Sequence, residues 1–221
     1  PPQPRPVAEF AAAINGTGNA LANVITGSDG ANILDGKEGA DRLTGGKGND
    51  TYVVDDSGDL VVEISLVATE VDLVRSSIGF DLSDSSNGNQ RAQIENLTLT
   101  GTAAVGTGNA KANTIVGNDA ANVLDGQGGL DTLKGGKDND TYHVDLVKMG
   151  TGATATVKLE DTITESLNQG LDTVILRGIV GDLVKATTLT VGANLEQLDA
   201  SQTGTTKLNL TGNPLNNRLI G

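Results

Sequence analysis

Residues 45–53 read Gly-Gly-Lys-Gly-Asn-Asp-Thr-Tyr-Val, and this nine-residue unit decides the fold. Three similar units precede it, GNALANVIT at 18–26, GSDGANILD at 27–35 and GKEGADRLT at 36–44, and a degenerate VDDSGDLVV follows at 54–62. Each unit carries Asn or Asp at its sixth position and an apolar residue at its eighth. Because nine residues are two and a half helical turns, successive units would face opposite sides of a helix. The pattern therefore predicts short strands joined by turns.

The group of units occurs twice in the chain. Residues 16–55 recur at 106–145, offset by 90 residues without a gap. The fifth unit of the second copy is interrupted and resumes at Asp161, and a third copy begins near the end. Repetition at a fixed short period is typical of solenoids, in which each repeat contacts only its neighbours.

Each unit is expected to divide into a strand and a turn. Positions seven to nine form a three-residue strand whose middle side chain points inward, and positions one to six form the turn. Glycines supply the left-handed backbone conformations that the turn needs. Two units then make one coil of 18 residues, and successive coils stack at about the 4.8 Å spacing of hydrogen-bonded strands.

This stacking places acidic residues close together. Asn23, Asp41 and Asp59 are expected to line one edge of the stack, and Asn32 and Asp50 the other. Two carboxylates about 5 Å apart repel by about 3 kcal/mol at an effective dielectric constant of 20, so a divalent cation between the coils is expected. Carboxylates and free turn carbonyls form the all-oxygen shell that Ca²⁺ prefers, whereas Mg²⁺ fits less well.

The composition points to the same class of partner. The net charge of −13 and the pI of about 4.3 argue against nucleic acid and anionic membranes and favour cations. The absence of cysteine excludes disulfides and thiolate chemistry. No stretch approaches the roughly 18 apolar residues of a membrane span. No pair of nucleophile and base can be proposed, so we expect no catalytic residue and no enzyme activity.

The unit GGKGNDTYV resembles the RTX nonapeptide, G-G-x-G-x-D-x-U-x, of secreted bacterial proteins. The resemblance covers about 100 residues, roughly 18–62, 108–145 and 212–221. It implies an all-β fold, a right-handed parallel β-roll. It also implies type I secretion to the cell exterior or surface, and folding driven by Ca²⁺ outside the cell.

The same resemblance implies a set of calcium ligands, with four to six ions expected in all. Asparagine at the sixth position predicts weaker sites than aspartate, and carbonyls from the turns 27–31, 36–40, 45–49, 117–121, 126–130 and 135–139 complete the shells. The expected ligands are Asp41, Asp50, Asp59, Asp131, Asp140 and Asp161, the substitutes Asn23, Asn32, Asn113 and Asn122, and the turn residues Gly27, Gly30, Gly36, Gly39, Gly45, Gly48, Gly117, Gly126, Gly129 and Gly135.

Between the blocks the nonapeptides are missing, but strand-like runs such as Val71–Arg75 and Ile94–Leu99 remain. These segments are either coils with longer turns, which we favour, or small independent β domains. The chain is thus expected to divide into an N-terminal linker at 1–13, a first roll at 14–62, a β connecting or capping segment at 63–104, a second roll at 105–165 with an insertion near 146–158, a second connecting segment at 166–207, and the start of a third roll at 208–221.

Three roles are compatible with these residues. The first is a calcium-triggered folding and secretion module. The second is a stalk segment of an adhesin or surface layer, with cell-surface or self-association partners. The third is the C-terminal carrier of a secreted enzyme or toxin whose active domain lies elsewhere. All three share the same calcium chemistry.

Overall fold

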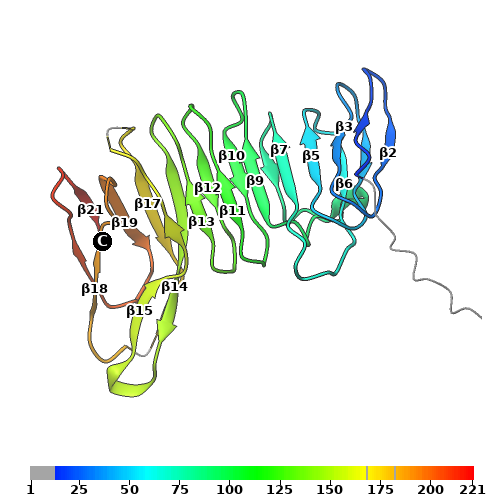
Figure 1. The fold of residues 1–221 in the computed structure, drawn as a ribbon. Coiled ribbons are helices and arrows are strands. Elements are labelled where there is room, and N and C mark those ends of the chain that lie inside the picture. Colours follow the sequence, from blue (N-terminus) through cyan, green and yellow to red (C-terminus); the bar gives the residue numbers. More distant parts are fainter. Residues whose placement is uncertain (1–12, 168, 182) are drawn as a thin grey trace, which may run out of the picture.

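The computed structural model describes residues 13–221 except 168 and 182, so the predicted linker at 1–13 lies almost wholly outside it. The regular structure of this part of the chain consists almost entirely of short strands joined by turns (Figure 1). The only helical elements of the described residues are two single 3-10 turns, Ser86–Gly88 and Gly152–Thr154. None of its helices is long and apolar enough to cross a membrane.

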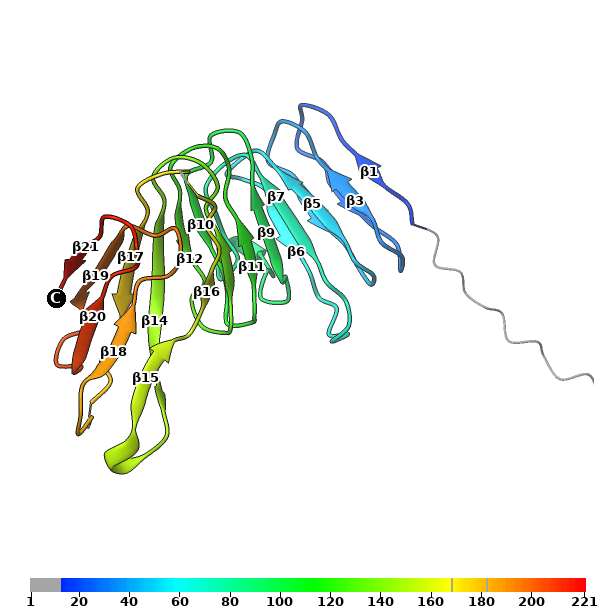
Figure 2. The same ribbon diagram turned by 60° about the vertical axis from the view of Figure 1, so that its left-hand side comes forward.

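The strands form two opposing faces of a stack (Figure 2). One face is a continuous sheet in the order β1 (Gly16–Thr17), β3 (Ile33–Asp35), β5 (Thr51–Val54), β7 (Leu73–Ser76), β9 (Asn96–Leu99), β11 (Thr114–Val116), β13 (Thr132–Lys134) and β16 (Thr162–Ile163). The opposite face begins with a three-stranded sheet of β2 (Val24–Thr26), β4 (Arg42–Thr44) and β6 (Leu60–Val62). It continues as β8 (Phe80–Asp81), β10 (Val105–Thr107), β12 (Val123–Asp125), β14 (Thr141–Met149), β17 (Thr173–Arg177), β19 (Gln197–Gln202) and β21 (Arg218–Ile220). A separate pair, β18 (Thr187–Thr190) and β20 (Leu208–Thr211), lies near the C-terminal end.

Strand register confirms the predicted coil. Within the nonapeptides, Leu34 pairs with Tyr52 and Leu43 with Val61, each 18 residues further along and parallel. The middle residue of the three-residue strand points inward, as predicted: Leu34, Leu43 and Tyr52 are all 0% exposed. Burial of one such side chain contributes about 1.5–3 kcal/mol, so the stacked inward residues supply the core of this parallel β-solenoid.

The segments between the nonapeptide blocks continue the solenoid. Strand β7 pairs with β5 before it and β9 after it, and β9 pairs with β11 of the second block. Because these coils have longer turns, the 90-residue offset contains an odd number of half-coils. The strand β4 therefore belongs to the three-stranded sheet, whereas its counterpart β13 belongs to the long sheet. Equivalent turns of the two blocks consequently lie at opposite edges of the stack.

The predicted insertion near 146–158 is a β-hairpin. Strand β14 runs past the coil to Met149, and β15 (Thr156–Leu159) returns antiparallel to it. The hairpin extends beyond the stacked coils (Figure 1). Residue Asp161 follows it and re-enters the stack, where β16 pairs with β13.

Candidate metal centre

Sixth-position residues form a ladder along each edge of the stack. The backbone N–H of Asn23 donates to Asp41 Oδ1 (2.7 Å), and that of Asp41 donates to Asp59 Oδ1 (2.9 Å). On the other edge the N–H of Asn32 donates to Asp50 Oδ1 (2.8 Å). The two edges therefore contain the residues predicted for them.

The second block repeats these ladders. The backbone N–H of Asn113 donates to Asp131 Oδ1 (2.6 Å), that of Asn122 to Asp140 Oδ1 (2.7 Å), and that of Asp131 to Asp161 Oδ1 (3.1 Å). The last bond places Asp161 on the ladder despite the intervening hairpin. One oxygen of each sixth-position carboxylate is thus used to hold the coil before it.

The ladders continue beyond the nonapeptides, which the sequence reasoning missed. The backbone N–H of Asp50 donates to Asp72 Oδ1 (2.7 Å), and that of Asp140 donates to Asp172 Oδ1 (2.8 Å). The next rungs are glutamates: the Asp72 N–H donates to Glu95 Oε2 (3.0 Å) and the Asp172 N–H donates to Glu196 Oε2 (3.0 Å). The signal was an acid two residues before an inward apolar residue, as in Asp72 and Val74.

Turns that carry asparagine are closed by hydrogen bonds within the protein. In the turn 117–122, the N–H of Asn118 donates to Asn122 Oδ1 (2.8 Å), and Asn122 Nδ2 donates to the carbonyl of Ala103 (2.9 Å) on the preceding coil. The asparagine side chains of the other four such turns accept the equivalent bond from the second residue: Asn19 to Asn23, Ser28 to Asn32, Asn109 to Asn113 and Asn213 to Asn217. These amide oxygens are satisfied without an ion.

Four of the turns that carry aspartate at the sixth position have a different backbone. Their second and fourth residues adopt positive φ, as Lys37 (67°) and Gly39 (107°) do in the turn 36–41. The same pair of left-handed residues occurs in the turns 45–50, 126–131 and 135–140, at Gly46 and Gly48, Gln127 and Gly129, and Gly136 and Asp138. In the described structure no N–H of these turns reaches the second carboxylate oxygen, so we call them open turns.

Each open turn therefore leaves a buried oxygen without a donor. The Oδ2 atoms of Asp41, Asp50, Asp131, Asp140 and also Asp161 are buried and have no hydrogen-bond partner in the described structure. An unpaired buried carboxylate oxygen costs several kcal/mol unless a cation or proton accompanies it. Asp59 differs, because its Oδ2 accepts bonds from the N–H groups of Asp55 and Asp56 (both 3.2 Å).

The first glycine of each unit leaves room for these oxygens. A Cβ built on Gly126 would lie 2.6 Å from Asp131 Cγ, and one built on Gly36 would lie closer still to Asp41 Cγ. The free carboxylate oxygens therefore occupy the space where a larger residue would place its side chain. Carboxylate oxygens held in this way suit a hard cation such as Ca²⁺.

When no ion is bound, burial makes Asp50, Asp131, Asp140 and Asp161 weaker acids. It raises the pKa of Asp50, Asp140 and Asp161 to about 6 and that of Asp131 to about 7. Neighbouring acids add to the effect, Glu63 at Asp50 and Asp161 at Asp131. A cation between the coils would oppose both causes.

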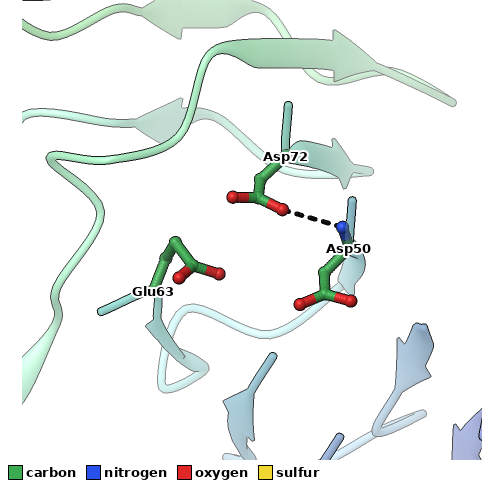
Figure 3. A group of neighbouring side chains, drawn as sticks. All are labelled: Asp50, Glu63 and Asp72. Atoms are coloured by element: carbon green, nitrogen blue, oxygen red, sulfur yellow. Dashed lines mark hydrogen bonds between the residues drawn. The ribbon is translucent and has the colours of Figure 1, made fainter. Parts of the chain in front are cut away.

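Two groups of three acids bring side chains from neighbouring coils together. One is Asp50, Glu63 and Asp72 (Figure 3) and the other is Asp140, Glu165 and Asp172. In each group one oxygen of every carboxylate lies within 4.8 Å of the others. At that distance two unit charges repel by about 3.5 kcal/mol at an effective dielectric constant of 20. Three ionised carboxylates would then cost about 10 kcal/mol, comparable to the stability of a whole domain.

Comparison with known proteins gives one match. Residues 17–52 and 107–142 match the family model described as RTX calcium-binding nonapeptide repeat, in four copies. No curated protein and no solved structure matches the chain. The matched residues end at Tyr52 and Tyr142, so Glu63, Asp72 and their counterparts in the second block lie beyond them.

Proposed function

Since the chain is an RTX-type calcium-binding repeat protein folded as a parallel β-solenoid, we propose that Ca²⁺ in its open turns drives folding and stability outside the cell. The observation that supports this role is the set of buried carboxylate oxygens without a partner. Four open turns carry them, and one ion at each gives the lower end of the expected four to six.

The ligands follow from the open turns. Asp41, Asp50, Asp131 and Asp140 each offer the free Oδ2, and carbonyls of their own turns complete the shell. A bound ion supplies positive charge between an open coil and the coil after it, whose facing ladder residues are both acids. The protein's part is to hold the carboxylates in place, because each Oδ1 is already fixed by the N–H of the preceding coil.

The asparagine turns take a different part in this proposal. Their amide groups already bond to the protein, so we expect Asn23, Asn32, Asn113 and Asn122 to close their turns without an ion. The sequence predicted a graded series of sites, weaker at the asparagines. We propose instead two kinds of coil: those with open turns bind an ion and those with asparagine turns do not.

Location and wider role are proposed on the same basis. Extracellular calcium is millimolar, a concentration that fills modules too weak to bind inside cells. The repeat family is a structural one, so we assign no catalysis to this chain. A stalk segment of an adhesin or surface layer is a second candidate, favoured by the long unbroken stack (Figure 1). A carrier of a secreted enzyme or toxin would use the same coils.

Far-UV circular dichroism with and without chelator tests the proposal. We expect EGTA to remove most of the β signal, millimolar Ca²⁺ to restore it and millimolar Mg²⁺ not to. D41N/D131N should raise the calcium midpoint at least tenfold, since it removes one charge from an open turn in each block. The control D29N/D119N removes exposed acids paired with Lys47 and Lys137 and should leave the midpoint unchanged. A β signal indifferent to chelation would refute the proposal.

A further inference from the structure

The two groups of acids lie at the end of each nonapeptide ladder, partly outside the family match. The first cluster is Asp50, Glu63 and Asp72, and the second cluster is Asp140, Glu165 and Asp172. Glu63 follows Gly45 by one coil of 18 residues and so takes the place of a turn's first glycine. A carboxylate thus stands where the nonapeptide turns leave space for oxygen.

A free oxygen points into each cluster. Asp50 and Asp140 are each 1% exposed, and the Oδ2 atom of each has no partner. A Cβ on Gly45 would collide with both Asp50 Oδ2 and the Tyr52 hydroxyl, so these two atoms face the same space. The Tyr52 hydroxyl in turn donates to Glu63 Oε2 (2.7 Å). The unpartnered oxygen therefore faces the glutamate.

The second cluster repeats this arrangement with different loop lengths. A Cβ on Gly135 would collide with Asp140 Oδ2 and the Tyr142 hydroxyl, and that hydroxyl donates to Glu165. Tyrosine and glutamate are 11 residues apart in the first cluster and 23 in the second, yet the same atoms meet. The geometry belongs to the stacked coils and not to the local sequence.

Within the described part of the chain, no basic side chain forms an ion pair with these clusters. The spacing of the three oxygens, within 4.8 Å of one another, fits a cation that binds oxygen at about 2.3–2.6 Å, whose ligands lie up to about 5 Å apart. Asp72 and Asp172, like Asp50 and Asp140, are nearly inaccessible to water, at 2% and 1% exposed.

We propose that each cluster is a calcium site of a second kind, held by carboxylates of two coils and tied to the core by a tyrosine hydroxyl. The four residues it adds are Glu63, Asp72, Glu165 and Asp172. The inference rests on the proposed function, because Asp50 and Asp140 also belong to open turns. In each cluster a glutamate replaces the first glycine of a nonapeptide turn and supplies the last ligand, so the ion lies where the nonapeptides end.

Native mass spectrometry at saturating calcium counts the ions directly. E63Q/E165Q should hold two ions fewer than the unmodified chain, whereas the exposed pair D29N/D119N should hold the same number as the unmodified chain. An unchanged count in E63Q/E165Q, with ions lost in D41N/D131N, would overturn this inference and leave the proposed function standing. An unmodified chain that binds no calcium would overturn the proposed function itself.

Terbium luminescence gives a second readout, whose first measurement uses the unmodified chain and so does not depend on whether a variant folds. The chain has two tyrosines and no tryptophan, and both phenols contact a cluster glutamate. Excitation of tyrosine in the unmodified chain should therefore produce strong Tb³⁺ emission that millimolar Ca²⁺ quenches by displacement. Absence of this emission would overturn the inference. In E63Q/E165Q the emission should fall at least twofold. An undiminished signal from the folded variant would also overturn the inference.

Discussion

Gly126→Ala tests the open turn at its most crowded point. A Cβ there would lie 2.6 Å from Asp131 Cγ and 2.8 Å from Asp131 Cβ, and closer still to the free Oδ2. Asp131 cannot simply rotate away, since its Oδ1 accepts from Asn113 N–H (2.6 Å) and its own N–H donates to Asp161 (3.1 Å). Either the turn shifts or the carboxylate leaves its ladder.

The magnitude follows from the two contacts at stake. Overpacking costs about 1–3 kcal/mol, and loss of a hydrogen bond to a charged group costs about 1.5–3 kcal/mol. We expect Gly126→Ala to lower the free energy of unfolding in calcium by about 3–5 kcal/mol. Because about 1.4 kcal/mol is tenfold in an equilibrium constant, coupling to the ion should raise the calcium requirement by more than a hundredfold.

Gly128→Ala in the same turn is the matched control. Its Cβ would meet nothing within 4 Å, and its backbone is not left-handed. Urea unfolding at saturating calcium and calcium titration by circular dichroism should separate the two variants, with Gly128→Ala close to the unmodified protein. If both variants unfold at the same urea concentration and share one calcium midpoint, the assignment of position one to the ion site is wrong.

Three further predictions follow from burial and hydrogen bonding. In chelator, the pKa values of Asp50 and Asp131, raised by burial to about 6 and about 7, mean that the native state binds more protons than the unfolded chain. The free energy of unfolding should therefore fall as pH rises from about 4 to about 7. Circular dichroism in EGTA should show more β structure at pH 5 than at pH 7.5, and the opposite order would contradict the raised pKa values of these buried acids. In urea unfolding, Leu124→Ala, at a position 0% exposed, should lower the free energy of unfolding by about 2–5 kcal/mol, whereas Val123→Ala, at 38% exposed, should lower it by less than about 1 kcal/mol. Equal effects would contradict the alternation of inward and outward side chains along the strand. Asn122→Ala should cost about 1–3 kcal/mol through its lost bonds to Asn118 and Ala103 without changing the number of ions counted by mass spectrometry, and a lost ion would show that an asparagine turn binds metal.

The nine-residue period was sufficient to predict the coil, because strand length, inward residue and stacking all depend on local spacing. Register, inward leucines and both edges agree with that prediction. The domain boundaries drawn from the sequence stay a prediction, although the sheet runs through 63–104 without a break.

The difference between open and closed turns could not be read from the sequence. Lys37 and Gln127 adopt positive φ although neither is glycine, whereas Gly30 in an asparagine turn does not. An aspartate at the sixth position does not by itself make a turn open, because the turn of Asp59 has no left-handed residue and is closed by the N–H groups of Asp55 and Asp56. Likewise, Glu63 lies outside any nonapeptide, and only the stacking of its coil on Gly45 brings it to Asp50.

The order of the two kinds of coil explains how a few ions could control the whole stack. In both blocks the asparagine turns come first and the aspartate turns follow, so each open coil lies between a closed coil and a connecting coil. In a solenoid each coil is stabilised only by its two neighbours. An open coil that repels the next one separates the closed coils before it from the connecting coils after it. Calcium at the open coils therefore acts on every coil beyond them, although it touches only the turns at their edges.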